Sequence, residues 1–198
     1  MIGFSEACER NKDPILGILL EVFTGCNNIL EIGSGTGQHA VYFGLNLSHL
    51  VWQPSDLGEN LEGIRERIEI EGTGNIKDPV ELDVTDLPWS VSGFDGVFTA
   101  NTLHIMPEEN SLKLFSGLRE AMFPGGILCI YGPFKYQGKF TSESNEQFDE
   151  FLRKKDPRSG IRDFEYINCI ADNNGFKMIS DHSMPANNQC IVWKKAGS

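Results

Sequence analysis

The sequence predicts an α/β fold, a doubly wound sheet that is mostly parallel and has an antiparallel edge strand. Up to Gly132, short apolar runs alternate with longer segments whose apolar residues recur at helical spacing. Glycines and prolines separate these segments. Two further apolar runs close the chain around a turn-rich segment. Five alternating strands and a closing pair predict a seven-stranded, Rossmann-like sheet with helices on both faces.

The N-terminal part of the chain supplies a helix and two strand–helix units. Asp13-Pro14 predicts a helix start, because an N-cap acid precedes a proline at the first helical position. Residues 28–32 form a short apolar run typical of a buried strand, and a helix over about 37–47 follows. Residues 50–53 predict the second strand, which Pro54 would end. The next helix is marked by apolar residues at helical spacing: Leu61, Ile64 and Ile68.

The remaining elements continue the alternation and then depart from it. Strands are predicted over 80–82, 96–100 and 126–131, and Pro107 would open the helix before the last of them. An inserted helical excursion at about 133–163 follows, with a capping box formed by Ser144 and Gln147. The predicted closing elements are a helix over 163–174 and strands over 176–180 and 190–194.

Composition predicts one domain, residues 1–198, and limits its partners. A chain of 198 residues with 40% apolar side chains is long enough to bury a sizeable core. The net charge of −11 disfavours nucleic acid, whose phosphates attract basic surfaces. No apolar run approaches a membrane span or a signal peptide, so we expect a cytoplasmic protein without a membrane partner. The five scattered cysteines and four histidines lack ligand spacing, so no metal site is predicted.

A glycine-rich loop after the first strand is the strongest local motif. Gly33, Gly35 and Gly37 surround Ser34 and Thr36, so the backbone can turn tightly and a ligand can approach it closely. A dinucleotide fingerprint needs a third glycine at the sixth place, which is Gln38 here. Glu31, just before the loop, suits the ammonium group of S-adenosylmethionine better than a pyrophosphate. The alternatives are an ordinary turn and a solvated strand end.

Two acids follow the next strands, where the carboxyl ends of a parallel sheet meet. Asp56 lies 19 residues after Gly37, close to the ~20-residue interval at which an acid binds ribose hydroxyls in nucleotide folds. Asp83 is placed to hold an adenine amino group, and Val84 to cover a face of the ring. The alternative for Asp83 is a loop acid that starts a turn toward Asp86.

Asn101 and His104 follow the fourth strand, where the reacting end of a ligand would lie. His104 is a candidate general base near neutral pH, with Asn101 beside it. A lone histidine near a helix start also serves for packing or capping, and this reading stays open.

Beyond these motifs the chain resembles the methyltransferase-like 26 family, a group of uncharacterised proteins of the class I methyltransferase type. The resemblance runs nearly end to end and is carried by residues 9–15, 30–40, 52–56, 82–84, Asn101, His104-Ile105, 131–134, Ser144-Asn145, 160–163 and 184–188. It implies the class I methyltransferase fold and an S-adenosylmethionine site formed by Glu31, Gly33, Gly35, Gly37, Asp56, Asp83 and Asn101. It implies no methyl acceptor.

The segments outside the cofactor motifs are where we expect the acceptor to bind. Asn11 and Lys12 would precede the first helix and fold over the cofactor as a lid. The other candidates are polar or aromatic residues in loops at the same sheet edge: Tyr131, Phe134, Asn145, Arg162, Asn187 and Asn188. Arg162 would suit a carboxylate or phosphate. Alternatively, these side chains brace the inserted helices by hydrogen bonds.

Three functions are consistent with the motifs. The first is an S-adenosylmethionine-dependent methyltransferase acting on a small molecule or a protein side chain, because methyl transfer needs alignment more than a dedicated base. No Asn-Pro-Pro-Tyr type signature of enzymes that methylate nucleic-acid bases follows Asn101. The second is a non-catalytic protein that binds S-adenosylmethionine or S-adenosylhomocysteine. The third, a nicotinamide oxidoreductase, is disfavoured by Gln38.

Overall fold

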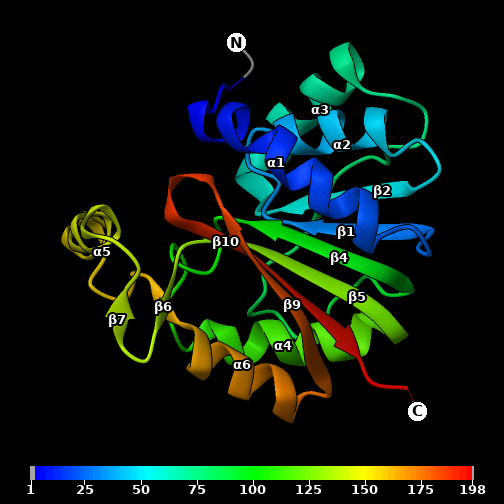
Figure 1. Ribbon diagram of the computed structural model, residues 1–198. Coiled ribbons are helices and arrows are strands. Elements are labelled where there is room, and N and C mark those ends of the chain that lie inside the picture. The colour runs from blue at the N-terminus through cyan, green and yellow to red at the C-terminus, as the bar shows by residue number, and fades with distance from the viewer. Residues whose placement is uncertain (1–2, 198) are drawn as a thin grey trace.

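The structure is a computed structural model that describes residues 3–197, and its centre is a seven-stranded sheet (Figure 1). The strand order is β3-β2-β1-β4-β5-β10-β9. Neighbours among the first five are parallel, whereas β10 is antiparallel to both β5 and β9. This confirms the predicted fold class. The bounds are β1 Asn28–Ile32, β2 Val51–Asp56, β3 Val80–Glu81, β4 Phe94–Ala100, β5 Met122–Gly132, β9 Phe176–Met184 and β10 Asn188–Lys195.

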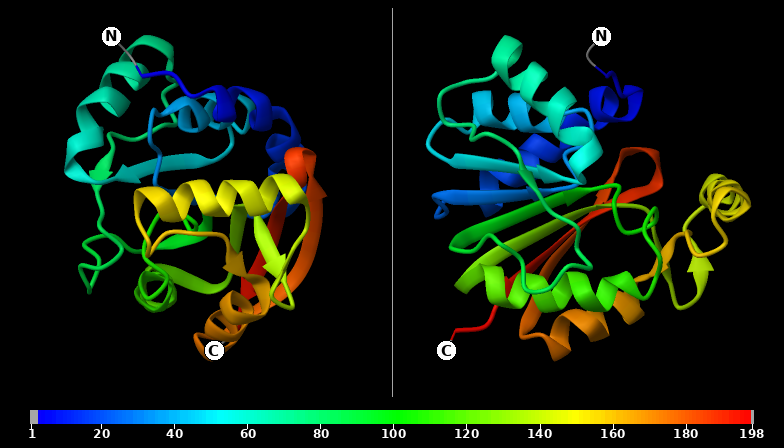
Figure 2. Two further views of the ribbon diagram at one scale, coloured as in Figure 1. Left: turned by 90° about the vertical axis from the view of Figure 1, so that its left-hand side faces the viewer. Right: turned by 180° about the vertical axis from the view of Figure 1, so that it is seen from behind.

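Helices cover both faces of the sheet, as Figures 1 and 2 show. One layer contains α1, α2 and α3, and the opposite layer contains α4 and α6. Among residues 3–197, no helix combines the length and apolarity that crossing a membrane requires. The α-helix bounds are α1 Glu6–Val22, α2 Gln38–Asn46, α3 Leu61–Glu71, α4 Asn110–Ala121, α5 Glu143–Lys155 and α6 Phe164–Asn173.

Alternation along the central strands builds a separate core on each face. Ile29 of β1 and Phe98 of β4 pack on the face covered by α1 and α2. Leu30 and Val97, one residue away in each strand, pack on the face covered by α4 and α6. Successive side chains of a strand point to opposite faces, so the uninterrupted apolar runs mark strands that are buried on both sides.

The first helix begins earlier than predicted. Its N-cap is Ser5, whose Oγ accepts a hydrogen bond from the backbone N–H of Cys8 at 3.3 Å, and Pro14 lies inside the helix. A proline removes one helical hydrogen bond. The buried side chains at a spacing of four residues, Asn11, Ile15 and Leu19, form one stripe that continues across Pro14. The packing of this stripe maintains the helix through the proline.

The second strand does not end at Pro54 but continues to Asp56. The backbone carbonyls of Trp52 and Asp56 face the β3 side of the sheet. They accept hydrogen bonds there from the N–H groups of Lys77 and Leu82 respectively. Pro54 lies midway between them, so its missing N–H also faces that side, where β3 pairs only with Ser55 and Asp56. The ladder with β1 therefore stays intact, and Asp56 is brought to the sheet edge.

The inserted segment between β5 and α6 forms a small second sheet and a helix. The sheet has the order β7-β6-β8, with β6 Phe134–Tyr136, β7 Lys139–Phe140 and β8 Arg162–Asp163. Helix α5 stands apart from the two main layers in Figures 1 and 2. Its N-cap is Ser142, whose Oγ accepts from the N–H of Asn145, so the predicted capping box starting at Ser144 is wrong.

Other element boundaries also differ from the predicted ones. Pro107 lies in a turn whose carbonyl accepts from the N–H of Asn110, and α4 begins only at Asn110. Strands β9 and β10 are longer than predicted, and only residues 185–187 connect them. This tight connection places the β9–β10 turn at the edge of the sheet where β4 and β5 also end.

The cap of α1 can be tested by substitution. Ser5→Ala removes the acceptor for the N–H of Cys8 and is expected to lower the free energy of unfolding by about 1 kcal/mol. Ser5→Asp, which keeps a capping oxygen, is the matched control. Urea denaturation of both variants checks this, and equal loss in the two would contradict the capping role.

Candidate active site

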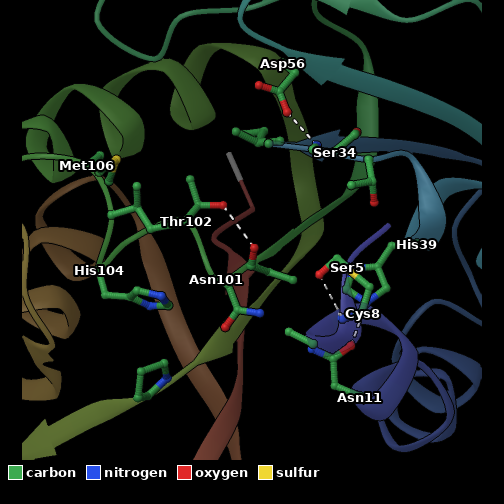
Figure 3. Close-up of a pocket in the computed structure, with 18 of the residues that line it drawn as sticks. Ser5, Cys8, Asn11, Ser34, His39, Asp56, Asn101, Thr102, His104 and Met106 are labelled. Atoms are coloured by element: carbon green, nitrogen blue, oxygen red, sulfur yellow. Dashed lines mark hydrogen bonds between the residues drawn. The ribbon is translucent and has the colours of Figure 1, made fainter. Parts of the chain in front are cut away.

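A cavity of about 1180 Å³ opens at the carboxyl ends of the parallel strands. Its lining includes residues that follow β1, β2, β3 and β4, together with the first turns of α1, part of α5 and the β9–β10 turn. Figure 3 shows Ser5, Cys8 and Asn11 on one side, His104 and Met106 on another, and Asn101 between them. Of the predicted site residues, the cavity brings together Asn11, Gly33, Ser34, Gly35, Asp56, Asp83, Val84, Asn101, His104, Asn145 and Asn188.

The glycine-rich loop is fastened to the neighbouring strand. The N–H groups of Gly33 and Ser34 both donate to the carbonyl of Ser55 at 3.0 Å, and the Oγ of Ser34 accepts from the N–H of Ser55 at 3.2 Å. Gly33 has a φ of 73°, and a Cβ there would lie 2.9 Å from the Oγ1 of Thr102. A side chain here would be strained and would have to displace Thr102, so glycine suits this position, and the loop passes closely over the end of β4.

Asp56 lies in the cavity wall beside this loop. One carboxylate oxygen accepts from the N–H of Gly35 at 2.6 Å, and the other accepts from the N–H of Leu57 and the Nδ2 of Asn60, each at 2.8 Å. The side chain is mostly buried but still lines the cavity. These bonds fix the direction of the carboxylate. A fixed carboxylate at the end of β2 is suited to accept hydrogen bonds from ligand hydroxyls.

Glu31 does not line the cavity; it lies buried beneath the loop. Its Oε2 accepts from the indole Nε1 of Trp52 at 2.9 Å, and its backbone carbonyl accepts from the Oγ of Ser55 at 2.7 Å. Burial raises the pKa of the Glu31 carboxyl to about 7, against the opposing effect of the hydrogen bonds from Trp52 and Ser34. In this structure Glu31 supports the loop from below. Direct contact with a ligand ammonium stays a prediction.

Of the remaining cofactor candidates after the first three strands, some line the cavity and one supports it from behind. Asp83 and Val84 line the cavity, and the Oδ1 of Asp83 accepts from the N–H of Thr85 at 2.8 Å in a local turn. Val84 also packs against the core under α4. Gly37 does not line the cavity: it is the N-cap of α2, with Arg67 and Ile64 behind it. Gly37 thus shapes the loop without facing a ligand.

Asn101 and His104 both reach the cavity from the loop after β4. Asn101 has a φ of 58°, a left-handed conformation that asparagine tolerates better than most side chains. The ring of His104 meets Phe148 edge-on, with centroids 5.4 Å apart. Burial, with a smaller contribution from the charge of Arg162, lowers the pKa of His104 to about 4. The imidazole is therefore neutral near pH 7 and is a weaker base than an ordinary histidine.

Arg162 is not an acceptor ligand, which corrects the prediction. Its guanidinium is 1% exposed and donates to the backbone carbonyls of Leu103 at 3.0 Å, Met106 and Arg158. It also pairs with Glu108 at 3.5 Å. These bonds consume the donors that a carboxylate or phosphate would need. Arg162 instead holds the loop that carries His104, and it does not line the cavity.

The polar residues of the inserted segment are brought to the cavity only in part. Asn145 lines it and is 5% exposed, with its Nδ2 donating to the Oγ1 of Thr141 and the carbonyl of Asn187, each at 2.9 Å. Asn188 also lines it. Asn187 does not: its side chain donates to the Oγ of Ser144 at 3.2 Å. The prediction that Asn187 lines the acceptor site is therefore wrong, because it closes the β9–β10 turn.

Three further acceptor candidates lie elsewhere. Lys12 is inside α1 and turned away from the cavity, where it pairs with Glu9 and lies over the ring of Tyr42. Tyr131 and Phe134 are 3% and 1% exposed and belong to the two cores. The prediction that Asn11 and Lys12 form a lid ahead of the first helix is also wrong, because α1 begins at Glu6 and contains both residues. The positions of Tyr131 and Phe134 in the sequence do not reveal that packing buries both rings.

Residues of α1 and α2 that the sequence analysis missed complete the wall. Ser5, Cys8 and His39 line the cavity. The ring Nε2 of His39 lies 2.7 Å from the Oδ1 of Asn11, and burial lowers the pKa of His39 to about 4. Neutral His39 thus donates to Asn11 and fixes its amide. For Ser5 and Cys8 the signal was Ser5 followed by Glu6 and Glu9, the acids of a first helical turn.

The cavity is large for a site that holds one small molecule. Its volume of about 1180 Å³ exceeds the roughly 300 to 1,000 Å³ typical of single small-molecule sites. A Cβ at Gly35 would meet no atom within 4 Å, so the loop backbone there is open to a ligand. Among residues 3–197, no cluster of three or more His, Cys, Asp or Glu side chains is arranged to hold a metal ion.

The buried carboxyl of Glu31 gives a test by pH. Its pKa lies above the ordinary value of 4.5, so its favourable contribution to stability is complete below about pH 4.5 and is lost as the pH rises to about 7. Glu31→Gln cannot ionise. We expect the free energy of unfolding of the wild type to fall, relative to that of the variant, by an amount on the order of 3 kcal/mol between about pH 4.5 and 8.

Urea denaturation across this pH range measures the difference. The control is Glu69→Gln on the exposed side of α3. A difference between wild type and Glu31→Gln that stays constant with pH would contradict the burial of an ionisable carboxyl.

Comparison with solved structures shows the same fold in methyltransferases. An O-methyltransferase family protein from Burkholderia thailandensis superposes with a TM-score of 0.84 and 16% identity, covering 98% of this chain and 58% of that one. Human N-acetylserotonin methyltransferase in complex with SAM gives 0.80 and 16%, covering 96% and 53%. PigF with SAH gives 0.77 and 20%, covering 96% and 64%. The class I methyltransferase fold is therefore confirmed.

Sequence comparison adds a curated relative and a family. Methyltransferase GfsG from Streptomyces halstedii is 26% identical over 129 residues, which are 64% of this chain and 44% of that protein. The chain thus spans less than half of this relative, and between about half and two thirds of the solved structures above. A family model described as "Protein of unknown function (DUF938)" matches residues 3–195. The chain belongs to the DUF938 family.

Proposed function

We propose that this protein is a methyltransferase that uses S-adenosylmethionine to methylate a small molecule or a protein side chain. The observation that carries the proposal is the single cavity in which the glycine-rich loop, Asp56, Asp83 and His104 meet. The methyltransferase fold and the GfsG relative support it. The resemblance to the methyltransferase-like 26 family is a finer part of the same proposal.

The cofactor-binding roles follow from the sheet edge. The backbone from Gly33 to Gly35 would lie against the methionine part, and Asp56 would accept hydrogen bonds from the ribose hydroxyls. Asp83 and Val84 would hold the adenine, with Asn101 near the reacting end. When bound, S-adenosylmethionine supplies a methyl group activated by the sulfonium. The protein's own task is to align the acceptor with it and to exclude water.

His104 has the position and the charge state of a proton acceptor. It is 5% exposed, lines the cavity and is neutral at pH 7. Arg162 fixes the carbonyls on either side of it, at Leu103 and Met106, and its charge also favours the neutral ring. We therefore assign His104 the role of accepting the proton of the acceptor, and Arg162 the role of a positioning residue.

Calorimetric titration tests the cofactor assignment. S-adenosylmethionine and S-adenosylhomocysteine are expected to bind the wild type, whereas NAD is not. Asp56→Ala should weaken binding of both at least about tenfold, because a charge-assisted hydrogen bond is lost. Asp86→Ala, an exposed acid four residues after Leu82, is the matched control and should bind normally.

The titration also separates the competing functions. Binding of NAD alone, or equal affinities in both variants, would contradict the proposed site. Binding of both sulfur compounds without turnover of S-adenosylmethionine in cell extract would instead support a non-catalytic binding protein.

The charge state of His104 is open to direct measurement. Because its pKa is lowered to about 4, the ring signals should stay constant from about pH 8 to about pH 5. NMR titration measures this, with the signals assigned by their loss in His104→Asn. A midpoint near the ordinary value of 6.5 would show that the ring is solvated and would contradict its burial.

A further inference from the structure

The cavity has two chemically different ends. Its charged lining side chains are Arg10, Asp56 and Asp83, which come from α1 and from the loops after β2 and β3. The loop after β4, the inserted segment and the β9–β10 turn contribute none. We call this second region the acceptor end: His104, Ile105, Met106, Pro107, Pro133, Ser144, Asn145, Phe148, Ala186 and Asn188. An acidic chain thus lines one end of its cavity with neutral groups.

Two charged side chains beside the acceptor end, Arg162 and Asp149, are paired away from it. Arg162 is bonded to backbone carbonyls and to Glu108. Asp149 of α5 pairs with Arg153 at 2.7 Å and accepts from the N–H of Ile161. His104 is neutral at pH 7. A charged group on a molecule entering this end would lose its water without gaining an ionic partner, which is costly.

An aromatic wall stands beside His104. Phe148 meets His104 edge-on at 5.4 Å and stacks on Phe151 at 6.4 Å with an interplanar angle of 19°. Phe148 is 36% exposed and lines the cavity, as do the apolar side chains of Ile105 and Met106. A flat apolar molecule can pack against the exposed face of such a ring.

One accessible oxygen of a mostly buried side chain, that of Asn145, offers a hydrogen bond to this molecule. Both amide hydrogens of Asn145 are used, by Thr141 and by the carbonyl of Asn187. Its Oδ1 has no hydrogen-bond partner among residues 3–197, although the side chain is 5% exposed and lines the cavity. A carbonyl oxygen in this position accepts, and so it selects a donor such as a hydroxyl.

We propose that the methyl acceptor is a small, uncharged aromatic molecule that carries a phenolic hydroxyl. This rests on the proposed function. The acceptor oxygen forms a bond to the methyl carbon while the carbon–sulfur bond breaks, its electron pair stays on sulfur and the hydroxyl proton passes to His104. His104 is a weak base, and a phenol, with a pKa near ~10, gives up its proton far more readily than an aliphatic alcohol does.

Three matched phenols test the proposal by binding. The probes are 2-(4-hydroxyphenyl)ethanol, 4-hydroxyphenylacetate and tyramine, which share a ring and hydroxyl and differ in charge. Each is titrated into protein saturated with S-adenosylhomocysteine, and binding is followed by ligand-observed NMR. The neutral probe should bind at least tenfold more tightly than either charged probe. Equal or tighter binding of a charged probe, or no binding of the neutral probe at millimolar concentration, would overturn the proposal.

Variants locate the site and separate the two proposals. Phe148→Ala should weaken the neutral probe at least fivefold with S-adenosylhomocysteine affinity unchanged, whereas Phe151→Ala, which lies outside the lining, should have little effect. Ile105→Lys, at an exposed position of the acceptor end, should raise the affinity for 4-hydroxyphenylacetate several-fold. Unchanged probe binding in both Phe148→Ala and Ile105→Lys contradicts the acceptor assignment alone. Failure of S-adenosylhomocysteine to bind contradicts the proposed function itself.

Discussion

The attachment of the β1–α2 turn to the end of β2 is the interaction on which the rest of the site depends. Gly33 and Ser34 donate to the carbonyl of Ser55, and Gly35 donates to the carboxylate of Asp56. The same bonds therefore shape the loop and aim the acid. They require β2 to continue past Pro54, which is possible because the missing N–H of that proline faces the side where β3 is short.

Burial distinguishes the polar residues that support the site from those that can contact a ligand. Glu31 bonds to Trp52 under the loop, and Arg162 bonds to the carbonyls that flank His104. Both side chains are almost fully buried and neither lines the cavity. The cavity wall instead contains residues whose oxygens can accept hydrogen bonds from a ligand: Asp56 at one end and Asn145 at the other. Alignment for a methyl transfer requires that the residues in contact with the ligands are held rigidly by the residues behind them.

The fold class, the alternation of strands and helices and the loops that meet at the cavity could be predicted, because they depend on local periodicity and on one topological rule. Loops after parallel strands meet at one end of the sheet, so Gly33, Asp56, Asp83 and Asn101 were expected to lie together, and they line one cavity. The acceptor residues could not be separated in this way. Whether Arg162 or Asn145 faces the cavity depends on which carbonyls lie within reach after folding, and no spacing encodes that.

A crystal structure of the protein with S-adenosylhomocysteine tests the central claim most directly. We expect the ribose hydroxyls to lie within hydrogen-bond distance of Asp56, and the sulfur to face the end lined by His104, Asn145 and Phe148. Density for the ligand elsewhere would contradict it, for example in the smaller pocket between α1, α2 and α3 that Lys12 and Arg67 line.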